Sequence, residues 1–281
     1  MTPALLTLAL HTPQNSVSLR NLPYVPGGGV RQQLDVDAPA GAKSAPVVVW
    51  IHGGGWRQGS KENPGPKRAF FLLHGWVFVS MNYRLSPAVT HPGHVEDVAA
   101  ALAFVHKEAA KWGGDPGRMV VMGHSAGAHL AALVATDARR LAKHDLPLST
   151  LRGAILLDSA GYDMVFQARQ AAGNRNPDAN IYGLAFGSDP AGWEDASPLH
   201  QAQKAKTKLP DMWMGVAENA RKLTNVRRFA DVVKASGAQA EIMDVTATKT
   251  HASINREFGT DGDPVTASAF AFAQRAVAPK P

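Results

Sequence analysis

A G-x-S-x-G pattern at residues 123–127, with Ser125 at its centre, constrains this chain more than any other feature. The apolar residues 118–122 before it predict a strand, and the alanine-rich residues 126–135 after it predict a helix. Strand, sharp turn and helix are the context in which such a serine serves as a nucleophile. The two glycines remove side chains that would collide where strand and helix meet, and the helix N-terminus favours developing negative charge. We therefore predict that Ser125 is a nucleophile exposed above the strand ends.

Strands and helices alternate through the rest of the chain. The continuous apolar, β-branched run at 45–51 predicts a strand buried on both faces, as in a parallel sheet. Other patterns predict two edge strands at 21–24 and 32–36, strands at 76–83, 153–158, 212–216 and 238–245, and helices at 69–74, 95–112, 225–235 and 264–273, the last with Asp263 as its N-cap. This alternation predicts the α/β class, with a doubly wound, mostly parallel sheet and helices on both faces. The length and the absence of a linker predict a single domain over residues 1–281.

Residues 161–208 interrupt the alternation. They hold many Gly, Pro, Asn and Ser residues and only scattered apolar ones. We predict that this segment is a small insertion within the domain that lies over the sheet as a cap or lid.

Composition excludes several classes of function. The chain has no cysteine, so disulfides, thiolate catalysis and cysteine-based zinc or iron–sulfur sites are excluded. No Asp/His cluster has metal-site spacing, and neither a dinucleotide glycine fingerprint nor a phosphate loop occurs, so we expect no metal and no cofactor. The net charge is +6, but the 29 Lys and Arg residues are scattered, which predicts a solvated basic surface rather than a nucleic-acid partner.

The apolar stretches are too short to suggest a membrane protein. None approaches the roughly 18 residues of a membrane-spanning helix, so we expect no membrane span. The apolar stretch at residues 4–10 is either the remnant of a signal peptide or an ordinary packing segment. A cytoplasmic location and export after signal-peptide removal both stay open, as does the oligomeric state.

A second glycine-rich motif, His52-Gly53-Gly54-Gly55-Trp56, directly follows the strand at 45–51. A serine nucleophile needs a base, a group that orients the base, and donors that hold the oxyanion. Such groups gather at the carboxyl ends of strands in an open α/β sheet, and glycines let backbone N–H groups approach a substrate oxygen closely. We predict an oxyanion hole made by the N–H groups of Gly54, Gly55 and Ala126, with His52 holding the loop by hydrogen bonding.

Four motifs taken together resemble the α/β-hydrolase superfamily: residues 52–56, 82–85, 114–116 and 123–127. The resemblance extends from about residue 30 to residue 275 and includes residues 196–199 and 251–255. It is strongest to carboxylesterases similar to hormone-sensitive lipase, to feruloyl esterases and to kynurenine formamidase. The resemblance implies the α/β-hydrolase fold, a serine mechanism and a small-molecule ester substrate. It does not identify that ester.

The resemblance also indicates which residues act as the general base and as the acid that orients it. His251 follows the last strand in the order Ser, acid, His, which indicates it as the base. The family usually has Asp in a Gly-x-x-Asp turn after the penultimate strand, whereas this turn begins at Gly215 and has Glu218 at the matching position. A Glu can also accept the imidazole N–H and stabilise the imidazolium, so Glu218 is the expected acid. Asp158 and Asp244, which also lie near strand ends, are the alternatives.

The expected substrate contacts are Trp56, His124 and Trp193, with Phe166, Tyr182 and Phe186 as further aromatic candidates for an acyl or aryl pocket. The leading hypothesis is a serine carboxylic-ester hydrolase that acts through an acyl-enzyme on small acyl or aryl esters, feruloyl-type esters among them. The same site could instead hydrolyse an N-formyl or other amide, as arylformamidases do. The chain could also be a catalytically silent relative that binds ligands, although that class often loses the histidine present here as His251.

Overall fold

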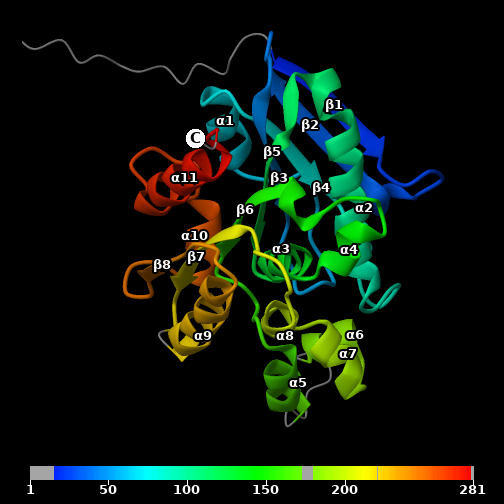
Figure 1. Ribbon diagram of the computed structural model, residues 1–281, viewed down its shortest axis with the longest axis vertical. Coiled ribbons are helices and arrows are strands. Elements are labelled where there is room, and N and C mark those ends of the chain that lie inside the picture. The colour runs from blue at the N-terminus through cyan, green and yellow to red at the C-terminus, as the bar shows by residue number, and fades with distance from the viewer. Residues whose placement is uncertain (1–15, 173–179, 220, 280–281) are drawn as a thin grey trace, which may run out of the picture.

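The structure, a computed structural model, describes residues 16–172, 180–219 and 221–279. The apolar stretch at residues 4–10 lies outside them. Within the described residues the core is an eight-stranded sheet in the order β1-β2-β4-β3-β5-β6-β7-β8 (Figure 1). The strands are β1 (Ser16–Pro23), β2 (Gln33–Pro39), β3 (Ala45–Ile51), β4 (Val77–Met81), β5 (Gly114–His124), β6 (Leu151–Leu157), β7 (Asp211–Ala217) and β8 (Ala240–Val245). Strands β3 to β8 run parallel while β1 and β2 pair antiparallel at one edge, which confirms the predicted mostly parallel sheet.

Strand β3 lies between β4 and β5 and is buried on both faces, as predicted. Val47, Val49 and Ile51 belong to one hydrophobic core, and Val48 and Trp50 belong to a second core on the other face. Successive side chains of a strand point to opposite faces, so this run supplies both cores at once. Each face of the sheet therefore needs its own layer of helices.

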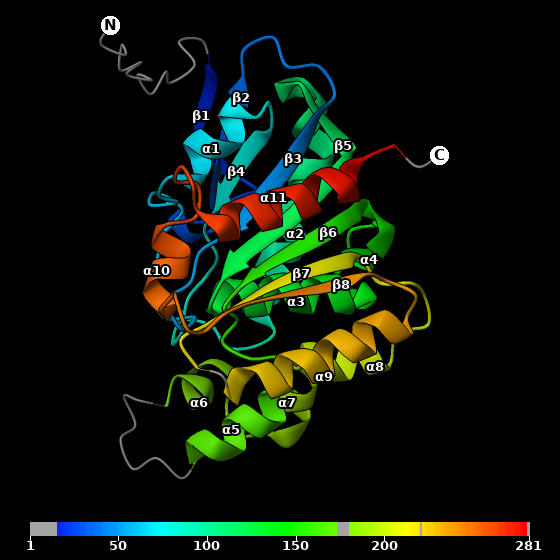
Figure 2. The ribbon, with the colours of Figure 1, turned by 90° about the vertical axis from the view of Figure 1, so that its left-hand side faces the viewer.

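Helices cover both faces of the sheet (Figure 2). The core on one face includes residues of α2 (Gly93–Glu108), α3 (Ala126–Thr136), α4 (Ala138–Ala142) and α9 (Arg221–Ala235). The core on the other face includes residues of α1 (Lys67–Leu73), α10 (His251–Arg256) and α11 (Pro264–Val277). Short 3-10 helices lie at Val30–Gln32, Ala109–Trp112 and Leu148–Thr150. Asp263 caps α11 by accepting the N–H of Thr266, as predicted.

Between β6 and β7 the chain forms α5 (Met164–Ala172), α6 (Ile181–Phe186), α7 (Pro190–Asp195) and α8 (Pro198–Gln203). These helices gather at one end of the molecule, below α3 in both views (Figures 1 and 2). The polar and proline residues of this segment start helices. Asn180 and Asp189 accept backbone N–H groups as N-caps, and Pro190 and Pro198 lie in first turns. We refer to residues 161–208 as the insertion.

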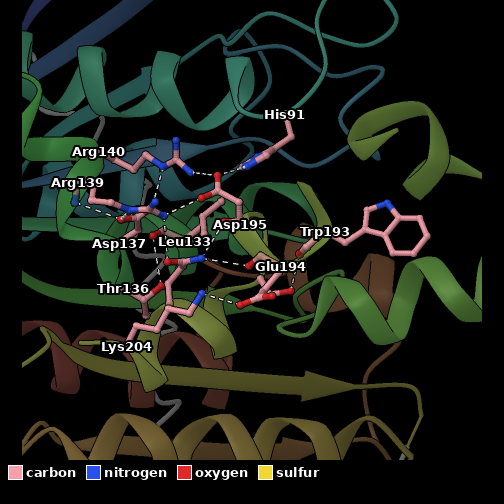
Figure 3. A network of polar contacts seen from close by, with 12 residues as sticks. His91, Leu133, Thr136, Asp137, Arg139, Arg140, Trp193, Glu194, Asp195 and Lys204 are labelled. Carbon is pink, nitrogen blue, oxygen red and sulfur yellow. Dashed lines mark hydrogen bonds and ion pairs between the residues drawn. The ribbon is translucent and has the colours of Figure 1, made fainter. Parts of the chain in front are cut away.

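An ionic cluster around Asp195, the last residue of α7, holds the insertion to the rest of the domain (Figure 3). The Asp195 carboxylate accepts from His91 Nε2 at 2.8 Å and from Arg139 at 2.7 Å, and it also pairs with Arg140. Both arginines pair with Asp137 as well. The hydrogen bond from His91, followed by the two arginines, holds the pKa of Asp195 well below its usual range. The cluster ties α7 to α4 and to the loop before α2.

Asp195→Asn should lower the free energy of unfolding by about 1–3 kcal/mol at neutral pH, because buried Arg140 loses one of its two carboxylate partners. The pKa of Asp195 is depressed in the folded state, so its contribution is present above its unfolded pKa of about 4 and is lost as the pH falls. Urea unfolding at about pH 7 and about pH 3.5 should therefore show the difference from wild type shrinking at the lower pH.

Glu194→Gln is the matched control for that experiment. Glu194 precedes Asp195 in the chain, and its carboxylate pairs with the exposed Lys204. Surface pairs of this kind contribute little to stability. An equal loss of stability in Glu194→Gln and Asp195→Asn would contradict the anchoring role of Asp195.

Candidate active site

Ser125 occupies a strained turn between β5 and α3. Its backbone has a φ of 54° and a ψ of −118°, which residues other than glycine rarely adopt. A Cβ added to Gly127 would lie 2.1 Å from the carbonyl oxygen of Ile51, and one added to Gly123 would lie 2.3 Å from the backbone of Gly127. Ser125 is partly exposed, whereas its neighbours in the run 119–136 are buried. The predicted sharp turn and its need for two glycines are therefore confirmed.

The loop after β3 lies directly against this turn. A Cβ added to Gly53 would lie 3.2 Å from Cβ of Ser125. Gly54 and Gly55 have φ values of +111° and +59°, which are the conformations that favour glycine. In the part of the chain that the structure describes, the N–H groups of Gly54, Gly55 and Ala126 donate to no protein acceptor. This arrangement is compatible with the predicted oxyanion hole.

His52 and Tyr83 hold the start of this loop. The Nδ1–H of His52 donates to the carbonyl of Gly53 at 2.7 Å, and its ring stacks on Tyr83 with 4.5 Å between centroids. The Tyr83 hydroxyl donates to the carbonyl of His52 at 3.2 Å. Burial lowers the pKa of His52 to about 4, so the ring is neutral at physiological pH. These contacts agree with the holding role expected for His52.

His251 is the first residue of α10 and lines the same pocket as Ser125. Its Nδ1–H donates to Oδ2 of Asp158, whose side chain is 1% exposed. A short helix begins here because Thr250 caps it in a capping box with Ser253. The cap fixes the backbone of His251, and the carboxylate fixes its ring. Since Nδ1 is committed to Asp158, Nε2 is the ring nitrogen left for chemistry.

The carboxylate in contact with His251 belongs to Asp158 and not to Glu218. The prediction that Glu218 orients His251 is therefore wrong. Glu218 has a φ of 63°, its N–H donates to the carbonyl of Lys249 in the loop before α10, and among the described residues its exposed side chain makes no hydrogen bond or ion pair with His251. Strands β6 and β7 are parallel neighbours in which Leu157 pairs with Gly215, so their ends lie side by side. Neighbouring strands are about 4.8 Å apart, and an acid after either strand can reach the same histidine.

Three donors converge on Asp158. His251 Nδ1 and Lys222 Nζ both contact Oδ2, the lysine at 2.7 Å, and the N–H of Ala217 donates to Oδ1 at 3.1 Å. Burial raises the pKa of Asp158, but these donors lower it by more, and the net shift is downward. No sequence motif points to Lys222, which precedes the helix predicted at 225–235 and lies in the first turn of the observed α9. Asp244, the other alternative acid, is exposed and bonds instead to Thr246.

His124 holds His251 from a second direction. It is 8% exposed, and its Nε2–H donates to the backbone carbonyl of His251 at 2.9 Å, with 4.5 Å between the ring centroids. Burial and the neighbouring His251 lower the pKa of His124 to about 3, so the ring is neutral. His124 therefore positions the start of α10. The expected substrate contact of His124 is corrected, because it does not line the pocket.

The pocket that contains Ser125, Asp158 and His251 has a volume of about 660 Å³. The insertion supplies part of its wall, through Phe166 on α5 and Tyr182 on α6. The remaining lining combines apolar, amide and charged side chains, among them Ile181, Val226, Gln167, Gln170, Asn225, Glu218, Arg221 and Lys222. The described residues contain no group of three or more His, Asp or Glu side chains arranged to hold a metal ion. None of the helices described is long and apolar enough to cross a membrane.

The other aromatic residues expected in the pocket lie elsewhere. Trp56 is fully buried, and its ring packs against His129 and Phe186. Trp193 lies on α7, and its Nε1–H donates to the carbonyl of Gly187. The expected substrate contacts of Trp56 and Trp193 are therefore corrected, because neither residue lines the pocket. The insertion folds onto Trp56 and removes it from the surface.

Gly127→Ala should cost about 3 kcal/mol or more in the free energy of unfolding, because the new methyl meets the backbone of β3 rather than a side chain that can move. Gly117→Ala is the control, since its added carbon meets the side chain of Asp115 at 3.2 Å. Chemical denaturation of both variants measures the difference. Equal stability of the two variants would contradict the close approach of α3 to β3.

Comparisons with known proteins place the chain in a family of similar sequences. A family model described as BD-FAE matches residues 34–211, well over half of the chain. The chain is 41% identical over 123 residues to the esterase LipQ of Mycobacterium tuberculosis, which is 42% of this chain and 29% of that protein. It is 27% identical over 237 residues to the isoprenylcysteine alpha-carbonyl methylesterase ICME of Arabidopsis thaliana, which is 80% of this chain and 55% of that protein. The chain thus spans less than two-thirds of the length of these relatives.

Solved structures share the fold. A truncated form of a carbohydrate esterase from gut microbiota superposes with a TM-score of 0.77 and 20% identity, over 95% of this chain and 98% of that chain. The native thermophilic esterase Est2 of Thermogutta terrifontis superposes with a TM-score of 0.68 and 25% identity, over 88% of this chain and 90% of that chain. From the strand order, the turn at Ser125 and the match to the family model, it follows that this chain is a member of the BD-FAE family with the α/β-hydrolase fold.

Proposed function

We propose that the chain is a serine carboxylic-ester hydrolase whose catalytic triad is Ser125, His251 and Asp158. The observation that carries the proposal is the bond from His251 to buried Asp158 in the same pocket as the strained Ser125. A histidine whose Nδ1 is held by an ionised carboxylate keeps Nε2 available as a base. The names of the relatives, which are esterases, support ester hydrolysis.

The reaction begins when Ser125 Oγ attacks the ester carbonyl and His251 Nε2 takes its proton. Asp158 stabilises the imidazolium through the Nδ1–H bond. His251 then returns the proton to the leaving alcohol, and the acyl group stays on Ser125. Water then enters, gives a proton to His251 and attacks the acyl carbonyl; as the carboxylic acid leaves, His251 returns the proton to Ser125 Oγ. These steps require no cofactor.

The oxyanion of each tetrahedral intermediate binds the N–H groups of Gly54, Gly55 and Ala126. The close contact of Gly53 with Ser125 and the free N–H groups support this assignment. The N-terminus of α3 adds a favourable field at the same point. Donors that are fixed before the reaction stabilise developing charge without reorganisation.

The pocket suits a small acyl or aryl ester. Its volume of about 660 Å³ falls in the range of small-molecule sites. Phe166 and Tyr182 offer aromatic faces, and Gln167 and Asn225 offer donors and acceptors for oxygen atoms on a ring. This mixture fits an aryl ester that carries hydroxyl or methoxy groups, as feruloyl esters do. The insertion acts as the cap that shapes this pocket.

Ser125→Ala should reduce ester hydrolysis by about 10⁴-fold or more while leaving the fold intact, because the nucleophile is removed. Initial rates on p-nitrophenyl acetate, butyrate and octanoate measure the loss, and the preferred chain length measures the depth of the acyl pocket. Turnover equal to wild type would refute the serine mechanism. Faster wild-type turnover of N-formylkynurenine than of the aryl esters would assign the site to amides instead.

Asp158→Asn should lower kcat by about 10³- to 10⁴-fold, because the imidazolium loses its carboxylate and the imidazole loses its preferred tautomer. Glu218→Gln is the matched control, since Glu218 lines the same pocket without a contact to His251. Its kcat should stay within about threefold of wild type. A large loss in Glu218→Gln with a small loss in Asp158→Asn would identify Glu218 as the acid after all.

A further inference from the structure

We propose that Lys222 is a positioning residue that extends activity to lower pH, because its ammonium shares the Asp158 carboxylate with His251. The proposal rests on the proposed ester hydrolysis, in which His251 must be neutral to accept the serine proton. A serine triad does not itself require a cation on its carboxylate. The role of Lys222 is therefore an addition to the triad.

Lys222 and His251 contact the same carboxylate oxygen of Asp158. Lys222 is the second residue of α9, and its Nζ lies 2.7 Å from Oδ2 of Asp158, the atom that also accepts the Nδ1–H of His251. The second carboxylate oxygen accepts the N–H of Ala217. The Lys222 side chain is 34% exposed and lines the pocket, whereas the Asp158 side chain is 1% exposed. The single negative charge of Asp158 is thus shared among three donors: His251, Lys222 and the N–H of Ala217.

The charges around the Asp158 carboxylate determine whether Lys222 favours the neutral or the protonated form of His251. While His251 is neutral, Lys222 and Asp158 form a neutral pair. Protonation of His251 then places a second positive charge beside Lys222, and the two repel each other. Without Lys222, the imidazolium would face an uncompensated carboxylate and form more easily. Lys222 therefore keeps His251 in its basic form to a lower pH.

Other titratable groups approach His251 without competing for Asp158. His124 packs on its ring, and burial keeps His124 neutral. Lys249, in the loop before α10, pairs with Glu257 and Asp263. The other titratable groups on the pocket side are Tyr162, Tyr182, Glu218 and Arg221, and in the described structure none of these has a polar contact with Asp158.

Lys67 is a further charged group near α10, and its titration must be separated from that of His251 by comparing variants. It is 1% exposed, donates to the carbonyl of Asn255 at the end of α10, and lies over the ring of Trp50. Burial lowers the pKa of Lys67 to about 7, within the range in which the activity of a serine esterase titrates. Because every variant below retains Lys67, its contribution cancels when their pH profiles are compared.

The expected pH shift depends on the distance between the Lys222 ammonium and the His251 ring, and on how far water screens the ammonium. Two donors on one carboxylate oxygen lie about 4 Å apart by ordinary hydrogen-bond geometry. A charge so close shifts the titration of a neighbouring group by about one to three pH units. Water reaches the partly exposed Lys222 and screens its charge, so we expect a shift of about 0.5–1 pH unit.

The test compares two neutral replacements with one that keeps the charge. Lys222→Met and Lys222→Gln remove the charge, Lys222→Arg retains it, and Lys234→Met on the exposed face of the same helix is the control. For each protein, kcat/KM on p-nitrophenyl butyrate is measured from about pH 5 to pH 9, and this profile reports groups of the free enzyme. The rate at which a fluorophosphonate labels Ser125 is measured over the same range. Thermal unfolding checks that each variant is folded.

The acidic limb of both profiles should move to higher pH by about 0.5–1 unit in Lys222→Met and Lys222→Gln, and should stay in place in Lys222→Arg and Lys234→Met. The proposal would be overturned if the acidic limb of both neutral variants stayed within about 0.2 pH unit of the wild-type position. A shift in Lys222→Met but not in Lys222→Gln would also overturn it, because a lost hydrogen bond and not the charge would then be the cause. The glutamine variant keeps a polar side chain at this partly exposed position, so the test stands even if the methionine variant unfolds.

The labelling experiment separates this inference from the proposed function. If the fluorophosphonate fails to label wild-type Ser125, the serine mechanism itself is wrong. If it labels Ser125 and the acidic limb does not depend on Lys222, the triad stands and the role of Lys222 is rejected.

Discussion

The approach of α3 to the end of β3 is the contact on which the candidate site depends. Gly127 has no side chain, so its backbone packs against the carbonyl oxygens of Ile51 and His52. This contact brings the loop after β3, which carries two of the proposed oxyanion donors, against Ser125. The unfavourable backbone conformation of Ser125 persists because the strand before it and the helix after it are buried and close-packed.

The parallel sheet brings the remaining groups to the same edge. Asp158 follows β6, and His251 follows β8, so strand ends far apart in the sequence meet over the pocket. His251 is fixed by Asp158 at its ring, by His124 at its carbonyl and by the cap at Thr250. On the proposed mechanism, a base held at three points loses little freedom when it reacts, as a preorganised site requires.

Helix α3 also holds the insertion. His129 on α3 donates from Nε2 to the carbonyl of Ala196 at 2.8 Å, and Trp56 packs between His129 and Phe186 of α6. The element that carries the proposed nucleophile and the loop that carries the proposed oxyanion donors therefore both contact the insertion. On the proposed mechanism, a change in the insertion that alters substrate choice must preserve these contacts, since they also support the reacting groups.

Local sequence patterns were sufficient to predict the elements that depend only on neighbouring residues. The glycines around Ser125, the β-branched run at 45–51 and the cap at Asp263 each act through their own neighbours, so the sequence by itself determined the turn, the buried central strand and the start of α11. Only the tertiary structure decided that Asp158 contacts His251, because the ends of β6 and β7 lie side by side and their order along the chain does not say which acid faces the histidine. The burial of Trp56 and the contact of Lys222 with Asp158 were decided in the same way. Each depends on how a distant helix packs, and sequence spacing carries no information about that distance.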